Sequence, residues 1–173
     1  MILHSDRSQL FCDLITEIAV EQLTLLCQHS VPLQIPVCAK ISLNIKRQWV
    51  PHLERAPRTV AAFEAILPFR SQIIHVRWSG ESAWIPLGDL SMGLGFENHT
   101  SHPAPGEVLL YPGGYSETEI LFPYGGTLFA SKMGQLAGNH FLTITNGAEQ
   151  LPELGRTVLW EGALDIVFDR SAA

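Results

Sequence analysis

Two basic side chains stand two residues apart in a stretch whose apolar pattern alternates as in a β-strand. The alternation predicts that His75 and Arg77 lie on the same face of that strand. A neutral imidazole next to a guanidinium can bind a carboxylate, with Arg77 donating two parallel hydrogen bonds. Many strands turn one face to solvent, so the alternative is that both residues are ordinary surface side chains.

Two carboxylates show the same spacing further along the chain. Glu117 and Glu119 are predicted to share a strand face with Leu121. Two close carboxyl groups can divide the roles of acid and base, or hold a cation. The alternative is a solvated face of an antiparallel strand, which has this same alternation.

His140 differs because its predicted face is apolar. The residue shares that face with Leu142 and Ile144, and this face should point toward the core. A histidine at the start of such a strand could act as the base of a site at the mouth of a barrel. It could equally be a core histidine that bonds to the backbone, since buried polar groups are nearly always paired.

Aromatic side chains with polar tips gather near the predicted turns. They are Trp78, Trp84, Tyr111, Tyr115, Tyr124 and Trp160. Such residues line pockets for small ligands, and they also plug barrel ends. The turns Ser79-Gly80 and Gly113-Gly114 offer backbone amides that could hold an anion.

Metal and cofactor sites are not predicted. Cys12, Cys27 and Cys38 have no C-x-x-C spacing, and His99 and His102 form no H-x-H or H-E-x-x-H motif. We read the cysteines as free thiols. A metal would require ligands from separate strands to converge, which the spacing alone does not indicate.

Charge is distributed unevenly along the chain. The formal net charge is -6, and the segment 78–131 contains six acidic residues but no Lys or Arg. This segment could pair with the basic residues that precede it, or form an acidic wall suited to an amine or a metal.

The sequence lacks the signals of three other classes of protein. It has no stripe of Lys and Arg, so nucleic acid is not an expected partner. It has no apolar run of the roughly 18 residues that a membrane span needs. The start does not have the pattern of a secretory signal, so we expect a cytoplasmic protein.

The first part of the chain differs in composition from the rest. Residues 9–28 have the apolar spacing of an amphipathic helix, and Pro32 and Pro36 predict an extended connector. We therefore predict a helical extension with a linker over 1–38 and a single domain over 39–173. The helix could dock on the domain, contact a partner or a second copy of the chain, or have no role.

The remaining pattern is mainly that of short strands between Gly and Pro turns. Strands are expected over 41–45, 48–53, 73–78, 83–87, 107–111, 117–122, 127–130, 140–145 and 164–168. A helix should begin at Pro57 and stop at Pro68, and a second, over 149–160, should break near Pro152 and Gly155. The segment 88–105 lacks periodicity, which is typical of a binding loop, a lid or a mobile loop.

Several long motifs resemble one bacterial family. They are Glu54-Arg-Ala-Pro-Arg-Thr59, Arg77-Trp-Ser-Gly-Glu81, Trp84-Ile-Pro-Leu-Gly88, Tyr111-Pro-Gly-Gly114, Ser116-Glu-Thr-Glu119, Phe122-Pro-Tyr-Gly125 and Gly138-Asn-His-Phe141. Over residues 39–169 the chain resembles the bacterial domain-of-unknown-function family 3830. The resemblance implies a cyclophilin-like fold and no established activity.

The fold expected from pattern and resemblance together is a mainly β, cyclophilin-like closed β-barrel capped by two helices. Ala56 to Phe63 also resembles the first helix of true cyclophilins. However, the Pro-Gly-Phe and Gln-Gly-Gly segments of those prolyl isomerases are missing here, so prolyl isomerisation is not predicted.

We expect a small polar or acidic metabolite to bind in a pocket at the barrel mouth. The residues expected to form that site are His75, Arg77, Trp78, Ser79, Gly80, Glu81, Trp84, Tyr111, Ser116, Glu117, Glu119, Tyr124 and His140. Two alternatives stay open. One is a hydrolase or isomerase that uses His140 as base and Glu117 as acid. The other is a structural or interaction subunit that makes contact through its N-terminal helix.

Overall fold

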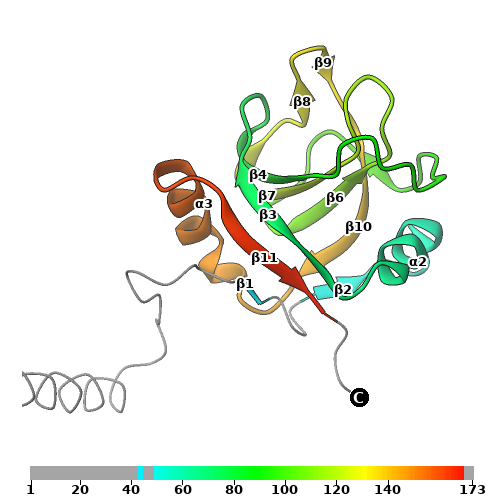
Figure 1. Ribbon diagram of the computed structural model, residues 1–173, viewed down its shortest axis with the longest axis horizontal. Helices are drawn as coiled ribbons and strands as arrows, with labels where there is room; N and C mark the ends of the chain where they lie inside the picture. Colours follow the sequence, from blue (N-terminus) through cyan, green and yellow to red (C-terminus); the bar gives the residue numbers. More distant parts are fainter. Residues whose placement is uncertain (1–42, 45–48, 170–173) are drawn as a thin grey trace, which may run out of the picture. The chain divides into compact units, whose positions relative to one another are not determined.

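The structure is a computed structural model that describes residues 43–44 and 49–169. These residues lie within the second of two compact units, Lys40–Ala173 (Figure 1). The helix and linker predicted over 1–38 lie outside the described residues. No helix in the described part is long and apolar enough to cross a membrane.

Strands are the most abundant regular elements of the described chain, which also has two α-helices and one short 3₁₀ helix. The strands are β1 (Leu43–Asn44), β2 (Trp49–Pro51), β3 (Phe69–His75), β4 (Gly80–Pro86), β5 (His99–Thr100), β6 (Glu107–Tyr111), β7 (Glu119–Thr127), β8 (Ala130–Ser131), β9 (Gly134–Gln135), β10 (Gly138–Ile144) and β11 (Leu164–Phe168). The helices are α2 (Pro57–Ala65), η1 (Ala148–Gln150) and α3 (Leu151–Trp160).

The main sheet is open, so the prediction of a closed barrel is wrong. Its strands follow the order β1-β11-β3-β4-β7-β6-β10-β2, with β5 paired to β10. A closed barrel requires every strand to pair on both sides. Within the described residues, β1 pairs only with β11 and β2 only with β10. The mainly β character and the two helices are as predicted, but alternation reveals strands without revealing whether the end strands meet.

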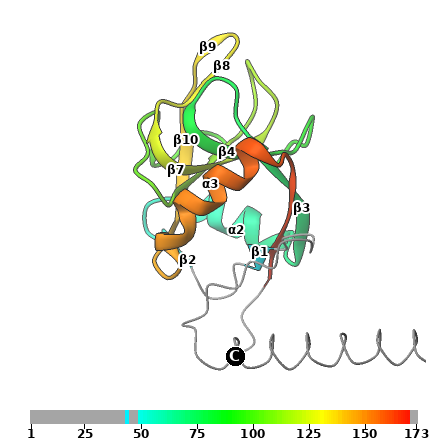
Figure 2. The same ribbon diagram turned by 90° about the vertical axis from the view of Figure 1, so that its left-hand side faces the viewer.

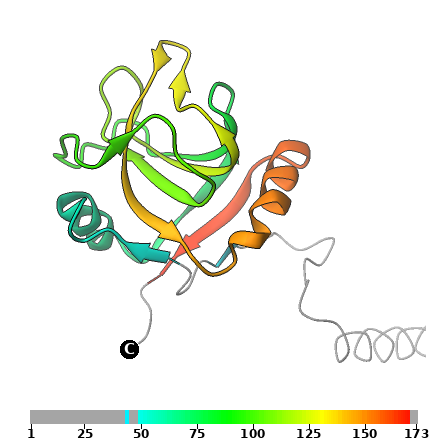
Figure 3. The same ribbon diagram turned by 180° about the vertical axis from the view of Figure 1, so that it is seen from behind.

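Each face of the curved sheet carries its own apolar cluster. The first cluster holds Phe63 of α2 and Leu154 of α3 together with one face of the strands. In this cluster α2 packs against β10, while α3 packs against β3, β4 and β7 (Figure 2). The second cluster consists of Val76, Leu109, Tyr111, Leu121, Phe129 and Leu136, with Trp84 packed against it. The hairpin β8–β9, near Phe129 and Leu136, projects away from both helices (Figure 3).

The helices begin where proline allows them to. Pro57 opens α2 as predicted, because a proline in the first turn removes no helical hydrogen bond. The break predicted in the second helix is wrong, because Pro152 also falls in the first turn of α3. Gly155 continues the helix and brings it close to β7: a Cβ added there would lie 2.3 Å from the ring of Tyr124.

Strand ends differ from expectation at β7 and at the hairpin of β3 and β4. A single strand, β7, runs through the turn predicted between the strands over 117–122 and 127–130. The strand predicted over 73–78 ends at His75, and the next begins at Gly80. Gly80 has a φ of +81°, and a Cβ there would meet the Gly126 carbonyl at 2.6 Å, so only glycine fits. The segment 88–98 is held by Asn139, whose amide accepts from Glu97 N at 2.9 Å and donates to Gly95 O at 2.9 Å. It is therefore anchored to β10 near its C-terminal end.

Candidate ligand-binding site

The pairing register decides which candidate residues share a face. Leu121 on β7 pairs with Leu109 on β6 and with Trp84 on β4. One step along, Glu119 pairs with Tyr111 and with Pro86. Since strand side chains alternate, these residues all lie on the face that carries the second cluster, which we call the second-cluster face.

Glu119 is the most unusual side chain on this face. It is only 6% exposed. Its carboxyl group has no hydrogen bond or ion pair within the described part of the chain, and of its two cross-strand neighbours Pro86 offers no donor. Buried polar groups are almost always paired with protein or water, so an unmatched carboxyl marks a place where a further partner belongs.

The surroundings of Glu119 favour its protonated form. Burial, followed by the negative charge of Glu117, raises the pKa of Glu119 from 4.5 to about 7. The carboxyl group can therefore gain or lose a proton near neutral pH. Glu117 itself is half-buried, and its Oε2 accepts a hydrogen bond from Gly88 N at 3.1 Å. The two carboxyl groups are thus near enough to interact, although Glu117 precedes β7 and is not on a strand as predicted.

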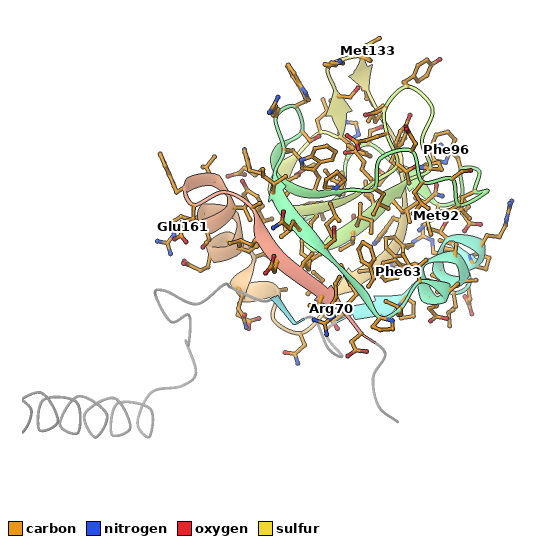
Figure 4. All side chains as sticks on the ribbon, in the orientation of Figure 1. Phe63, Arg70, Met92, Phe96, Met133 and Glu161 are labelled. Carbon is orange, nitrogen blue, oxygen red and sulfur yellow. The ribbon has the colours of Figure 1, made fainter. Side chains whose placement is uncertain are left out.

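Aromatic rings and a tight turn surround the cross-strand neighbour of Glu119. The Tyr111 hydroxyl accepts from Tyr115 N at 3.1 Å. Gly113 and Gly114, both with positive φ, let the chain turn back at this point. The rings of Phe96 and Phe129 lie 6.4 and 5.9 Å from that of Tyr111. Phe96 is 56% exposed (Figure 4), so the aromatic group reaches the surface. Ser116 is half-buried in the same turn.

His140 lies elsewhere on the second-cluster face, because β10 contains a bulge. His140 pairs with Leu109, but Leu142 pairs with Val108, so the register shifts between them. The prediction that His140 shares the core face of Leu142 is therefore wrong. Its Nε2 lies 2.9 Å from Thr143 Oγ1, and its ring packs against His52 at 4.3 Å between centroids. Burial lowers the pKa of His140, and His52 and Arg55 lower it further against the opposing effects of Glu107 and a backbone bond at Leu142.

Sequence reasoning missed His52 and Thr143. His52 Nε2 also lies 2.9 Å from Thr143 Oγ1, so two imidazoles share one hydroxyl. The contact joins residues 91 positions apart through the pairing of β2 with β10. No local spacing signals such a contact.

His75 and Tyr124 occupy the opposite face of the sheet. His75 lies two residues after Ile73, and Tyr124 lies two residues after Phe122. Ile73 and Phe122 belong to the first cluster, so His75 and Tyr124 share its face. The Tyr124 hydroxyl and His75 Nδ1 are 3.0 Å apart. Burial, followed by the charge of Glu81, raises the pKa of Tyr124. The sheet itself separates this pair from Glu119.

The candidates in the hairpin between β3 and β4 have structural partners. Ser79 Oγ donates to Ala130 O at 3.0 Å and accepts from Ala130 N at 3.1 Å. Glu81 Oε2 accepts from Gly126 N at 2.6 Å. Arg77 and Trp78 are exposed in the turn, outside any strand. Among the described residues no interaction joins either of them to Glu119 or His140.

The structure thus brings together only part of the predicted site. Glu117, Glu119, Tyr111 and Ser116 meet at one end of β6 and β7, with Trp84 on the same face. His140 is two strands from β7, a separation of about 10 Å between strand axes, and no bond or ring contact within the described residues joins it to Glu117. Nor do the described residues contain a group of three His, Cys, Asp or Glu side chains that could hold a metal ion.

Comparison with known proteins agrees with the motifs. The family described as "Protein of unknown function (DUF3830)" matches residues 49–169. The chain belongs to this family. The DUF3830 match includes every element that carries the candidate residues. Among curated proteins, none matches this chain.

One solved structure that resembles this DUF3830 chain is described as "Structure of McbB in complex with tryptophan". The two are 16% identical with a TM-score of 0.56. The match covers 72% of this chain but 41% of the other, so this chain corresponds to about two fifths of that protein. At this identity the likeness concerns the fold.

Proposed function

We propose that this DUF3830 protein binds a small metabolite through the Glu119 carboxyl group, and that the bound group is a protonated amine. The observation that carries the proposal is that Glu119 is only 6% exposed and that its carboxyl group has no hydrogen-bond or ion-pair partner in the described part of the chain. A cationic hydrogen-bond donor would satisfy the carboxylate oxygens and compensate their loss of water.

Charge around Glu119 supports an amine over an anion. Glu117 is close enough to raise the pKa of Glu119, and the segment 78–131 supplies no Lys or Arg. Two neighbouring carboxylates attract a cation and repel an anion. Arg77, the residue expected to bind an acidic group, is exposed in the turn after β3. Of the small polar or acidic metabolites expected from the sequence, we therefore favour a polar amine over an acid.

The aromatic side chains support a ligand with a flat apolar part. Tyr111 is the cross-strand neighbour of Glu119, and the exposed Phe96 ring lies 6.4 Å from it. Aromatic rings stack on flat ligands and attract cations. The similar solved structure contains tryptophan, a molecule with an indole ring and an amine. That protein, of which the match covers 41%, thus binds a molecule of this chemical class.

Catalysis by the same carboxyl is a second candidate function. A general acid or base works best when its pKa lies near the working pH, and the pKa of Glu119 is raised to about 7. In this version Glu119 takes a proton from the bound molecule or gives one to it. This mechanism replaces the one expected from the sequence, in which His140 is the base and Glu117 the acid. In the structure the side chains of His140 and Glu117 interact with different partners.

Binding of three related probes tests the proposal. L-tryptophan, tryptamine and indole-3-acetate share an indole ring, but only the first two carry an amine. We expect tryptamine to raise the melting temperature of the protein near neutral pH and indole-3-acetate to leave it unchanged. Isothermal titration calorimetry should show that Glu119→Gln weakens tryptamine binding at least about tenfold, since the charge-assisted bond is lost.

The control is Glu149→Gln, an exposed carboxylate in η1. This variant should bind tryptamine like the unmodified protein. Equal binding of tryptamine to the Glu119→Gln variant would contradict the proposal, as would equal stabilisation by tryptamine and indole-3-acetate. Turnover of a bound amine, lost in Glu119→Gln, would identify the catalytic version.

A further inference from the structure

A buried hydrogen-bond donor on the second-cluster face has no acceptor among the described residues. Tyr111 is only 3% exposed, and its hydroxyl oxygen accepts from Tyr115 N at 3.1 Å. A phenol hydroxyl also donates one proton, and no group in the described part of the chain accepts it. Buried polar groups are almost always paired, so this proton, like the carboxyl group of Glu119, marks a place where a further partner belongs.

The two unmatched groups come from residues that are paired across the sheet. Tyr111 on β6 pairs with Glu119 on β7, and side chains opposed in this way lie close together on one face. The hydroxyl donates and the carboxylate accepts, so the two could bond to each other. The described residues contain no such bond. A single bound molecule with a donor for Glu119 and an acceptor for Tyr111 would satisfy both groups.

The turn after β6 leaves the Tyr111 hydroxyl accessible from the surface. Gly114 is exposed, with a φ of +126° that favours glycine. A Cβ added at Gly114 would lie 3.3 Å from the Tyr111 hydroxyl oxygen and, its chain neighbours apart, within 4 Å of no other described atom. A bound molecule can therefore reach the hydroxyl past Gly114.

The charges at this place favour a neutral acceptor over a carboxylate. Within the described chain, Glu117, Glu119 and Tyr111 form no bond or ion pair with a Lys or Arg. The negative charge of Glu117 already acts on Glu119. A carboxylate next to the ligand amine would bring a further negative charge to the two carboxyl groups, whereas a carbonyl oxygen accepts a hydrogen bond without that charge.

We propose that the ligand carries a neutral carbonyl group next to its protonated amine, as in an amino acid amide or ester. The amine donates to Glu119, and the Tyr111 hydroxyl donates to the carbonyl oxygen. The two polar groups are neighbours in such a molecule, as Glu119 and Tyr111 are in the sheet. The inference rests on the amine proposed at Glu119 and names the class of compound that bears it.

Isothermal titration calorimetry of the full chain near pH 7 with three indole amines tests the inference. Tryptamine has no carbonyl group, L-tryptophanamide has a neutral one, and L-tryptophan has a carboxylate. We expect L-tryptophanamide to bind at least about threefold tighter than either of the others, because it alone adds a hydrogen bond without adding a negative charge.

A variant of Tyr111 identifies the donor. Tyr111→Phe keeps the ring and removes the hydroxyl, so it should lower the affinity for L-tryptophanamide at least about threefold, and more than the affinity for tryptamine. Comparing each ligand with itself removes the difference in basicity between the two amines. The matched control is Tyr124→Phe, which removes a hydroxyl on the opposite face and should leave both affinities unchanged.

The outcomes separate this inference from the amine proposal. If tryptamine binds as tightly as L-tryptophanamide, the inference is overturned, since water then satisfies the Tyr111 proton, and the amine proposal stands. Tighter binding of L-tryptophan than of its amide would also overturn it, because the acceptor would be a carboxylate. Equal losses for both ligands in Tyr111→Phe would have the same consequence. If none of the three binds, the amine proposal fails and this inference fails with it.

Discussion

At the scale of single residues, the candidate site depends on one carboxyl group. Spacing predicts that Glu117 and Glu119 share a strand face. In the structure β7 begins at Glu119, but the charge of Glu117 still acts on Glu119 from the preceding turn. The sequence left a solvated face as the alternative, because alternation does not show which face a sheet covers. Phe129 and Leu136, from the segment after β7, pack in the second cluster and help bury that face.

The pH dependence of stability tests the state of Glu119. Its pKa is raised from 4.5 to about 7, so between these values the folded protein binds more protons than the unfolded chain. The stabilisation that Glu119 contributes is complete below about pH 4.5 and is lost as pH rises through about 7. We expect Glu119→Gln to remove this loss, which amounts to at most about 3 kcal/mol. Denaturant unfolding at several pH values measures it, and parallel pH curves for both proteins would argue against a raised pKa.

The pair of His75 and Tyr124 tests the separation of the two faces. Tyr124→Phe removes the bond between the Tyr124 hydroxyl and His75 Nδ1 but keeps the ring against α3. We expect the free energy of unfolding to fall by about 1 kcal/mol, the usual net worth of one hydrogen bond. Tryptamine affinity should not change, because Glu119 lies on the other face. A large loss of affinity in calorimetry would show that the faces are coupled.

At the scale of elements, the local sequence pattern predicts the bounds of a helix or strand well where the types of residue alone determine them. The strands over 107–111 and 164–168 were predicted with the bounds that β6 and β11 have, and Pro57 opens α2. The bulge in β10 could not be predicted, because it depends on pairing with β6 rather than on local residues. That single inserted residue moves His140 to the face opposite Leu142 and places it beside His52.

Because α3 lies close to β7, replacing a helical glycine by alanine should lower the stability of the protein rather than raise it. Gly→Ala in a helix normally stabilises it by up to about 1 kcal/mol. A Cβ at Gly155 would overlap the Tyr124 ring, so we expect Gly155→Ala to destabilise the protein by about 1–3 kcal/mol. Chemical denaturation measures this change. In a Tyr124→Ala background the destabilisation should vanish, and its persistence there would mean that the ring contact is not the cause.

At the scale of the whole molecule, the arrangement of the sheet decides which candidates meet. Residues with strong local patterns were placed on strands correctly, but the predicted site combined side chains from two opposite faces. Glu119 and Tyr111 remain together, whereas His75 and Tyr124 lie on the face that α3 covers. The order of strands is a long-range property, and one sequence without pairing information does not determine it. Whether the end strands of the sheet pair with each other is part of the same long-range order.

The central claim is that the buried carboxyl group of Glu119 binds a cationic ligand. Carbon-13 NMR of the Glu119 side-chain carboxyl, followed against pH with and without tryptamine, tests this directly. We predict a midpoint near the raised pKa of about 7 in the free protein and a clear fall when the amine is bound, because the cation stabilises the carboxylate. A midpoint near 4.5 that tryptamine leaves unchanged would contradict it.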